Sequence, residues 1–427
     1  MATPTPGTPS MLRAINDRAA LEALLAEGPL TRPRLSDLTG ISKPTASQLL
    51  ARLVEAGLVV QDGVREGLPG RTAELYRING AAAHVAGVDV TPARIRVAVA
   101  DLAGTTVAEH TLPTPERTGV DIVARTGAAL DGAAEAAGLA RARLRRAVIG
   151  IQGAVDPGTG RLGYAAHIPG WHVPDVAGTL SEGLGVRVRI ENDVNLSALA
   201  EQAGGEAAGV RDFVLLWVAD GVGMAVVLNG ALHRGATGGA GEIGYMPAVG
   251  APLMRDVRRT HTGGVHSLTG GAAVLRLMRE HGYRGRDAAS ALARAAADAE
   301  AEDGAARPDA RHAGARHAGG PRETGPHGHG EDGGAGRGGE ALRELATRLG
   351  ATLATVVAVI DPALVVLTGD VLRAGGEPLR ARVERQLHSL SIPRPAVRLS
   401  SVRGNPVLAG ALQQALRETR DEVFSTA

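Results

Sequence analysis

The first eighty residues carry apolar side chains at the spacing of amphipathic helices, in three short runs separated by turn residues. The first run is imperfect, and Gly28-Pro29 ends it. Its apolar positions are Leu12, Ile15, Leu21, Leu24 and Leu25. The second run opens at Thr31, places Leu35 and Leu38 inward and closes at Gly40. These patterns predict two helices joined by a short connection.

The third run has a clear beginning and a clear end. Ser42 is a preferred N-cap, Pro44 is tolerated in a first turn, and Gly57 stops the helix. One face is apolar and consists of Ala46, Leu49, Leu50 and Leu53. Two alternating stretches, 58–60 and 74–78, follow as the strands of a hairpin. The order of these elements describes a winged helix-turn-helix, which we assign to the first eighty residues.

The outer face of the third predicted helix is polar. It carries Ser42, Lys43, Thr45, Ser47, Gln48 and Arg52. Small hydroxyls, an amide and cations are the groups that reach base edges and phosphates in a major groove. Nine basic residues against eight acidic ones in this segment give no broad positive field, so a winged helix that binds protein is the alternative. The placement of Lys43, Arg52 and, in the wing, Arg71 favours DNA.

From residue 85 onward, strands alternate with helices. A meander at 85–90, 94–101 and 105–112 is followed by a helix near 120–137 and by further strands. A similar order of elements restarts at residue 213. Two successive halves of one design predict an α/β protein with two lobes that face a cleft. We place lobe 1 at residues 81–205 plus about 403–427, and lobe 2 at 206–402.

One segment of lobe 2 contains nothing to bury. Between Leu292 and Leu342 there is no Val, Ile, Leu, Met, Phe, Trp or Tyr. Such a segment cannot offset the entropy lost on ordering, so we expect residues 293–341 to be a disordered insert. Its histidines are His312, His317, His327 and His329. Their irregular spacing argues against a metal-binding tract.

Composition adds limits on compartment and chemistry. The chain has 427 residues, 44% of them hydrophobic and 21% charged, with a net charge of +1, which is ordinary for a globular protein. It has no cysteine, which excludes disulfides and thiolate chemistry. No apolar run is long enough to span a membrane, and residues 1–10 lack the pattern of a signal peptide. We expect a cytoplasmic protein without a membrane partner.

Two stretches concentrate polar groups where α/β proteins bind ligands. Asn192 and Asp193 lie between an apolar strand and a helix, and hence at the carboxyl end of the strand. Residues 238–245 form a glycine-rich loop with one carboxylate, Glu242, and such loops indicate close backbone approach. Two carboxylates and an amide suit a polyhydroxylated ligand. The alternative is structural, with Asn192 or Asp193 capping the helix and Glu242 solvated.

Four motifs resemble those of a known family. They are residues 153–160 (GAVDPGTG), 168–171 (IPGW), 191–195 (ENDVN) and 234–244 (RGATGGAGEIG). Apart from the insert, residues 11–427 resemble the ROK family of bacterial sugar kinases and sugar-responsive repressors. The resemblance implies a two-lobed actin-like, hexokinase-type (ribonuclease H-like) fold, and the preceding helix-turn-helix implies the repressor branch. It also implies that Asn192, Asp193 and Glu242 bind sugar hydroxyls, with Asp193 as the base in a kinase.

The nucleotide side departs from the family's pattern. Family kinases place an Asp-Leu-Gly-Gly-Thr-Lys loop over the ATP phosphates, but residues 89–94 read Asp-Val-Thr-Pro-Ala-Arg. The glycines whose backbone N–H groups cradle phosphate are missing, and Pro92 has no N–H at all. The second phosphate loop reads Ala-Asp-Gly at 219–221, and residues 368–370 add another acid. Like charges repel in such a place, so we expect neither ATP nor another cofactor.

The sugar side departs as well. Tyr245 occupies the position of the family's sugar-contacting and zinc-binding histidine, and its hydroxyl can still bind a sugar. His266 aligns approximately with a second sugar-contacting glutamate. The family's cysteine cluster is missing from residues 253–271, so no structural zinc is expected. His261 and His266 lack a third ligand, which makes ordinary loop histidines the simpler interpretation, and we expect no metal.

These observations give one leading hypothesis and two alternatives. The leading hypothesis is a non-enzymatic, sugar-responsive transcriptional regulator that represses carbohydrate uptake or catabolism genes and binds its effector between the lobes. Its partners would be double-stranded operator DNA, a sugar or sugar derivative, and further copies of itself in a dimer or tetramer, because a helix-turn-helix usually reads paired half-sites. The first alternative is a hexose kinase with Asp193 as base. The second is a regulator that acts without a ligand.

Overall fold

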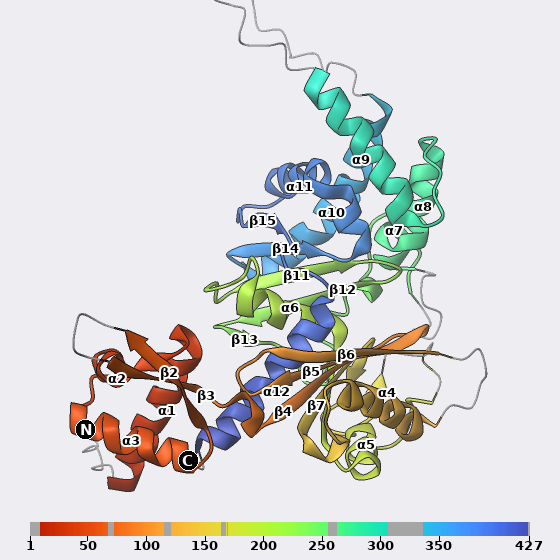
Figure 1. Ribbon diagram of the computed structural model, residues 1–427. Helices are drawn as coiled ribbons and strands as arrows, with labels where there is room; N and C mark the ends of the chain where they lie inside the picture. The colour runs from red at the N-terminus through yellow and green to blue at the C-terminus, as the bar shows by residue number, and fades with distance from the viewer. Residues whose placement is uncertain are drawn as a thin grey trace, which may run out of the picture. The chain divides into compact units, whose positions relative to one another are not determined.

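The computed structural model describes residues 9–66, 72–114, 121–163, 168, 170–254, 263–305 and 336–425 (Figure 1). The chain divides into two compact units. Unit 1 comprises the chain up to Ala203, the short segment Ala236–Gly239, and the chain from Arg403 onward. Unit 2 comprises Gly204–Gly235 and Ala240–Val402.

Unit 1 begins with an N-terminal module of three helices and a three-stranded sheet of order β1-β3-β2. Its elements are α1 (Pro9–Glu27), β1 (Leu30–Thr31), α2 (Arg32–Thr39), α3 (Lys43–Glu55), β2 (Val59–Glu66) and β3 (Thr72–Ile78). The side chain of Thr31 caps α2, and Gly40 ends it in the left-handed conformation with φ 69°. Ser42 caps α3 by accepting a hydrogen bond from the backbone N–H of Thr45. The predicted helices and hairpin are therefore confirmed, but Leu38, predicted to face inward, is exposed.

The buried residues of the N-terminal module are only partly the ones that the apolar pattern of α1 predicts. Leu21 and Leu24 are buried, as predicted, but Leu12 and Ile15 are exposed, because the first turns of α1 extend beyond the rest of the module's core. Two residues from distant parts of the chain, Leu102 and Phe424, complete the core instead. The N-terminal module is thus not packed independently of the rest of unit 1.

The larger part of unit 1 is built on a five-stranded sheet of order β10-β7-β4-β5-β6. Its strands are β4 (His84–Val90), β5 (Arg94–Asp101), β6 (Thr106–Pro113), β7 (Leu144–Ile151) and β10 (Arg187–Asn192). A separate two-stranded sheet joins β8 (Ala154–Val155) and β9 (Leu162–Gly163). The helices are η1 (Gly80–Ala82), α4 (Ile122–Ala136), η2 (Arg141–Arg143), α5 (Val176–Leu184), α6 (Asp193–Gly204) and α12 (Pro406–Ser425). β4, β5 and β6 form the predicted antiparallel meander, and β7 and β10 add to it in parallel.

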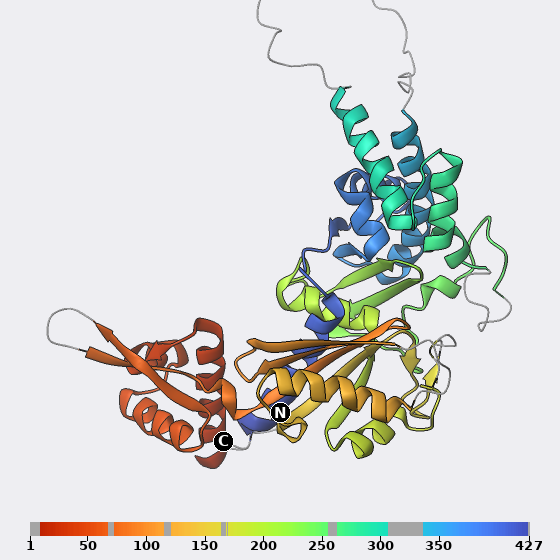
Figure 2. The same cartoon turned by 45° about the vertical axis from the view of Figure 1, so that its right-hand side comes forward.

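Helices cover both faces of this sheet. α4 and α5 bury their apolar residues on one face, and α12 lies across the other (Figure 2). Glycines let α12 come very close. A Cβ at Gly410 would lie 1.8 Å from the carbonyl oxygen of Leu196 in α6, and a Cβ at Gly150 would lie 2.4 Å from Val407. α12 is therefore in backbone contact with α6, the helix that Asp193 begins.

Unit 2 contains a second five-stranded sheet of order β13-β12-β11-β14-β15. Its strands are β11 (Phe213–Val218), β12 (Val222–Leu228), β13 (Ala231–Leu232), β14 (Leu364–Thr368) and β15 (Ala396–Leu399). Its helices are η3 (Ile243–Tyr245), α7 (His266–Thr269), α8 (Gly271–Glu280), α9 (Ala288–Ala305), α10 (Arg337–Ile360) and α11 (Asp370–Leu390). α11 packs on β11, β14 and β15, and α9 and α10 pack on α11.

The two sheets share one design. In each, a three-stranded antiparallel meander is extended by two parallel strands on the side of its first strand. This equivalence confirms the prediction that the second half of the chain repeats the order of the first.

The predicted disordered insert at 293–341 was wrong at both ends. Residues up to Ala305 continue α9, and residues from Arg337 begin α10. The segment has no large apolar side chain, but small ones suffice for burial here. Ala291, Ala295 and Ala299 recur every four residues and are fully buried in the core of unit 2. The remainder of the segment, 306–335, lies outside the described residues.

Within the described part of the chain, no helix has both the length and the apolar character needed to cross a membrane.

Candidate DNA-binding face and ligand-binding residues

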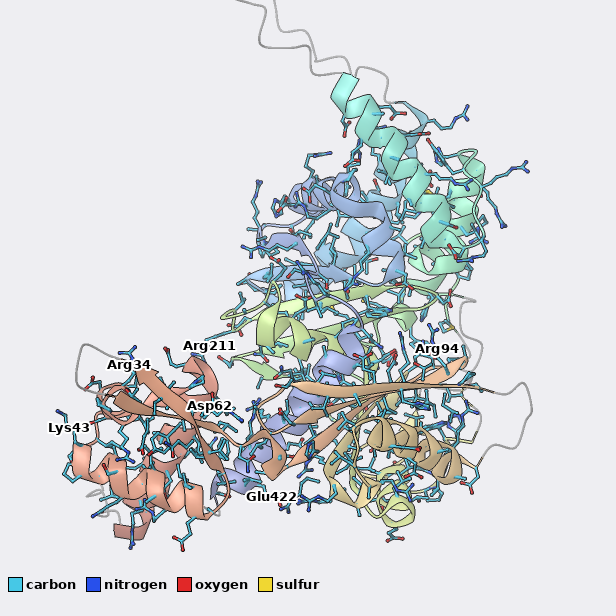
Figure 3. The ribbon with its side chains drawn as sticks, in the orientation of Figure 1. Arg34, Lys43, Asp62, Arg94, Arg211 and Glu422 are labelled. Carbon is cyan, nitrogen blue, oxygen red and sulfur yellow. The ribbon has the colours of Figure 1, made fainter. Side chains whose placement is uncertain are left out.

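The outer face of α3 consists of the polar side chains predicted to contact DNA. Ser42, Lys43, Ser47 and Gln48 are exposed, Thr45 is half-buried, and Lys43 extends outward from the start of the helix (Figure 3). The opposite face is fully buried and holds Ala46, Leu49, Leu50 and Leu53. The two faces are separated as the sequence predicted, so α3 can enter a groove without losing its core contacts.

Several of these polar groups already have intramolecular partners. The hydroxyl oxygens of Ser42 and Thr45 lie 2.8 Å apart, and Ser47 donates to the carbonyl of Lys43. Gln48 and Lys43 are the exposed long side chains of the face. They are therefore the residues best placed to reach a base edge and a phosphate.

Arg52 has a structural role within the module. Its guanidinium lies 2.7 Å from the carboxylate of Asp17 in α1, whose side chain is only 4% exposed, while that of Arg52 is 42% exposed. A buried carboxylate requires such a partner. Arg52 thus ties α3 to α1, and its role in DNA contact stays a prediction. Arg71 lies outside the described residues.

Asn192 and Asp193 lie where the sequence placed them, at the end of β10 and the start of α6. The Oδ1 atom of Asn192 accepts hydrogen bonds from the backbone N–H groups of Val194 (2.9 Å) and Asn195 (3.1 Å), and its Nδ2 donates to the carbonyl of Gly153 (3.0 Å). The structural alternative is therefore correct for the oxygen of Asn192, because it caps α6. A ligand would have to use the second N–H of this amide.

Asp193 is a half-buried carboxylate beside another acid. Burial, and then the nearby carboxylate of Asp89, raise the pKa of Asp193 to about 7. Asp89 itself is buried and is held by two groups: Arg96, at 2.8 Å, and the amide of Asn405, also at 2.8 Å. Asp193 has no such cation in the described contacts, so its charge is disfavoured at neutral pH.

The raised pKa predicts that Asp193→Asn stabilises the protein at alkaline pH. In the unfolded chain the carboxyl ionises near its ordinary pKa, whereas in the folded chain it ionises only near pH 7. Stability is therefore lost as pH rises from about 4 to 7, and the variant does not lose it. We expect a gain of roughly 1 to 3 kcal/mol at pH 8, below the full ~1.4 kcal/mol per pKa unit because Asp193 is partly exposed. Denaturant unfolding at pH 4 and pH 8 measures this gain.

Asp37→Asn, at an exposed position of α2, is the matched control for that measurement. It should change stability little at either pH. An equal effect of Asp193→Asn at pH 4 and at pH 8 would show that the charge of Asp193 is not disfavoured in the folded protein.

The turn at residues 91–94 does not fit a triphosphate. The backbone N–H of Thr91 donates to the carbonyl of Arg94, and the backbone N–H of Arg94 donates to the hydroxyl of Thr91, so two of the turn's backbone donors are used within it. Pro92 supplies none. In addition, Arg96 and Asn405 both donate to the Oδ2 atom of Asp89. The turn therefore does not fit the family's glycine-rich phosphate loop, and no chemical step through a nucleotide follows from it.

The glycine-rich loop approaches neighbouring backbone closely, as predicted. A Cβ at Gly241 (φ 94°) would lie 1.9 Å from the carbonyl oxygen of Met224, and a Cβ at Gly238 (φ 80°) would lie 2.6 Å from that of Val155. No other residue type fits either position. Gly241 thereby fixes the backbone directly before Glu242, which is half-buried at the start of η3.

Tyr245 and His266 lie together in unit 2. Their rings meet edge to face, with centroids 5.6 Å apart and planes at 86°. His266 is buried, its Nδ1 accepts from the backbone N–H of Val222, and its ring fills the space beside Gly244. These donors do not fit the family's zinc, since a tyrosine and no cysteine stand here. Among the described residues no cluster of three or more His, Cys, Asp or Glu could hold a metal, and His261 lies outside them.

Sequence reasoning missed the polar network that supports Asn192 and Asp193. Asp89 and Arg96 are direct partners in the antiparallel register of β4 and β5, so the hairpin pattern could have paired them. Glu191 is buried and accepts a hydrogen bond from Asn195 at 2.9 Å, one turn further along α6. Asn405 precedes α12 as its cap, but only the tertiary structure brings it to Asp89.

Comparison with known proteins agrees with this architecture. Residues 15–70 match the MarR family, and residues 85–298, half of the chain, match the ROK family. The chain belongs to the ROK family. The resemblance drawn from the four motifs is thereby confirmed, and the MarR match covers most of α1, all of α2 and α3, and strand β2 of the N-terminal module.

Curated and solved relatives of this ROK protein include regulators. It is 25% identical to the xylose repressor of Caldicellulosiruptor bescii over 56% of its own length and 60% of the relative. It is 25% identical to the N-acetylglucosamine repressor of Escherichia coli O6:H1, over 66% of its own length and 69% of the relative. The aligned part thus spans less than two thirds of the first of these.

A solved structure covers almost the whole ROK chain. It is described as a ROK family transcriptional regulator, homologous to the MLC protein of E. coli. The similarity has a TM-score of 0.69 at 18% identity and covers 97% of this chain and 100% of the other. The predicted winged helix-turn-helix followed by an actin-like, hexokinase-type fold is therefore confirmed.

Proposed function

We propose that this ROK protein is a sugar-responsive, DNA-binding transcriptional regulator that represses carbohydrate genes. The observation that carries the proposal is that α3 is amphipathic, with an exposed polar face and a fully buried apolar face. The module that contains α3 shares its core with the ROK fold. Pairing of two recognition helices on one operator implies a homodimer or a larger homo-oligomer.

We propose further that the effector is a sugar or a sugar derivative. Asn192 and Asp193 in unit 1, and Glu242, Tyr245 and His266 in unit 2, would contact its hydroxyl groups. The two repressors to which the chain is similar are named for xylose and N-acetylglucosamine, and both are candidates. The turn at 91–94 lacks the glycines of the family's phosphate loop, Pro92 supplies no backbone donor, and Asp89 is ion-paired to Arg96, which favours a sensor over a kinase.

A thermal-shift screen of the full chain tests the ligand side. The probes are xylose, N-acetylglucosamine, glucose and their phosphates, each with and without Mg-ATP. At about 100 times its dissociation constant a ligand adds about 2.7 kcal/mol, which is readily visible. We expect a shift with one sugar and none with Mg-ATP. Sugar-dependent ATP consumption that Asp193→Asn abolishes would make the protein a kinase. No thermal shift with any of the sugars would make it a regulator that acts without a ligand.

On the DNA side, Gln48→Ala and Lys43→Ala should have different effects. An amide reads base edges, so Gln48→Ala should cost about 1–3 kcal/mol on the preferred duplex and much less on random DNA. A lysine at the helix start meets phosphate, so Lys43→Ala should weaken binding to all duplexes and lower the salt slope by about one unit. Fluorescence anisotropy against a duplex selected from a random pool, at several salt concentrations, measures both. Equal losses for Gln48→Ala on selected and random DNA would place the reading face elsewhere.

A further inference from the structure

The first half of α12 is seated directly on the helix that carries Asp193. At Gly410 the backbone of α12 lies against the carbonyl of Leu196 in α6, so close that no side chain would fit at position 410. A Cβ at Gly150 in β7 would lie 2.4 Å from the side chain of Val407, and a Cβ at Gly87 in β4 would lie 3.0 Å from the carbonyl oxygen of Leu408. Packed interiors transmit such displacements because they contain no space to absorb them. A movement of α6 must therefore displace α12.

The start of α12 is also bonded to the carboxylate next to Asp193. The Oδ1 atom of Asn405 caps α12 by accepting from the N–H groups of Val407 (3.0 Å) and Leu408 (3.3 Å), while its Nδ2 donates to Asp89. Asp89 is the acid that raises the pKa of Asp193. A single side chain thus connects the polar cluster to the first turn of α12.

The second half of α12 belongs to the N-terminal module. Phe424 is 2% exposed in the core of that module. Arg420 donates from Nε and a terminal nitrogen to the carbonyl of Leu102, at 3.0 and 2.9 Å, and the N–H of Leu102 donates to the carbonyl of Gly80, where the module ends. In Figure 1 α12 crosses the sheet and its end, marked C, lies beside the N-terminal module.

From the end of α12, two consecutive residues of α1 lead to the DNA-reading helix. Arg18 pairs with Asp421 of α12 at 2.6 Å. Its neighbour Asp17 is buried and pairs with Arg52 of α3 at 2.7 Å. Contacts therefore run without a break from Asp193 through α6, α12 and α1 to α3, and every one of them lies in unit 1.

We propose that α12 is the coupling element of this protein: it transfers a change at the Asn192–Asp193 end of α6 to the orientation of α3. This inference rests on the proposed function, since it names the element through which the effector would act on DNA binding. A ligand shifts such an equilibrium only by its differential affinity for two states. In this protein the two states would differ in how α12 packs against α6.

The test removes the far end of the coupling without touching the polar cluster. Arg420→Met keeps the apolar stem of the side chain but loses both hydrogen bonds to Leu102. Asp421→Asn loses only the exposed pair to Arg18 and provides a second, milder variant. Arg417→Met, at an exposed position one turn earlier on α12, is the matched control. For each full-length protein we would measure the affinity for the selected duplex with and without the sugar found in the screen, and the sugar affinity itself.

Allosteric coupling commonly changes affinity by about 5- to 150-fold. We expect Arg420→Met to reduce the effect of sugar on DNA affinity at least ~3-fold relative to wild type, with sugar affinity unchanged within about twofold. Asp421→Asn should reduce it less, and Arg417→Met should retain it. If both Arg420→Met and Asp421→Asn keep the full effect of sugar, α12 is not the coupling element, although the proposed function stands.

A second readout separates this inference from the response to sugar. If no sugar binds, or if a bound sugar leaves DNA affinity unchanged, the proposed response fails by itself. Hydrogen exchange of Asp193→Asn against wild type, without any ligand, then decides the role of α12. Altered exchange in residues 406–425 and in α1 supports coupling through α12, and this change should be lost from α1 in the double variant with Arg420→Met. A change confined to α6 overturns it.

Discussion

Replacing Gly410 with alanine is expected to lower the free energy of unfolding of unit 1 by about 1 to 3 kcal/mol. Alanine is favoured over glycine within a helix by up to ~1 kcal/mol, so the intrinsic effect has the opposite sign. Here the new Cβ would lie 1.8 Å from the carbonyl oxygen of Leu196, and neither group can rotate away because both are backbone or bonded to it. The overlap must push α12 off α6, and such overpacking costs more than the helix preference returns. Denaturant unfolding followed by far-ultraviolet circular dichroism measures the loss.

Gly204→Ala is the matched control for that substitution. Gly204 ends α6, and a Cβ there meets nothing within 4 Å. It should leave stability unchanged or raise it by up to ~1 kcal/mol. If Gly410→Ala behaves in the same way, the close seat of α12 on α6 is wrong, and the coupling proposed for α12 loses its first step.

The second large effect is expected for Phe424→Ala, near the end of the described chain. Phe424 is buried among α1, α3 and the strands of the N-terminal module, and removal of a buried phenyl ring costs about 3–5 kcal/mol. The loss should appear in the N-terminal module, as faster hydrogen exchange of α1 and α3 and as weaker DNA binding, although the substitution lies at the opposite end of the sequence.

Ser425→Ala, at the exposed neighbouring position, should leave both properties unchanged. Fraying of α12 alone, with α1 and α3 as protected as in the wild type, would show that the module folds without its C-terminal partner. In that case neither the shared core nor the transfer of a signal through it would hold.

Local features could be read directly from the sequence. Ser42 and Thr31 cap their helices, Gly40 ends α2, and the apolar face of α3 is buried at all four predicted positions. Asn192 and Asp193 lie at the boundary of β10 and α6, as the change of pattern indicated. Each of these depends on interactions within a few residues, and short-range periodicity records such interactions.

The errors share another cause. Leu12 and Ile15 continue an apolar pattern but are exposed, and neither belongs to the core of the N-terminal module. Residues 293–305 have no large apolar side chain but are helical, because buried alanines suffice against α10 and α11. The amide oxygen of Asn192 caps a helix. The family motif assigns this residue to a ligand and does not reveal the capping role. Whether a side chain is buried depends on the segment that packs against it, and that segment can lie far away in the sequence.

The sequence by itself determined the order of the elements, the duplicated α/β design and the polar face of the third helix, because these follow from periodicity and from capping chemistry along the chain. Only the tertiary structure decided which distant groups meet. It brought Asn405 to Asp89, Gly410 to Leu196 and Phe424 into the N-terminal module. Such contacts are selected by the packing of the whole unit, in which segments from both ends of the chain share one core, and no local pattern contains that information.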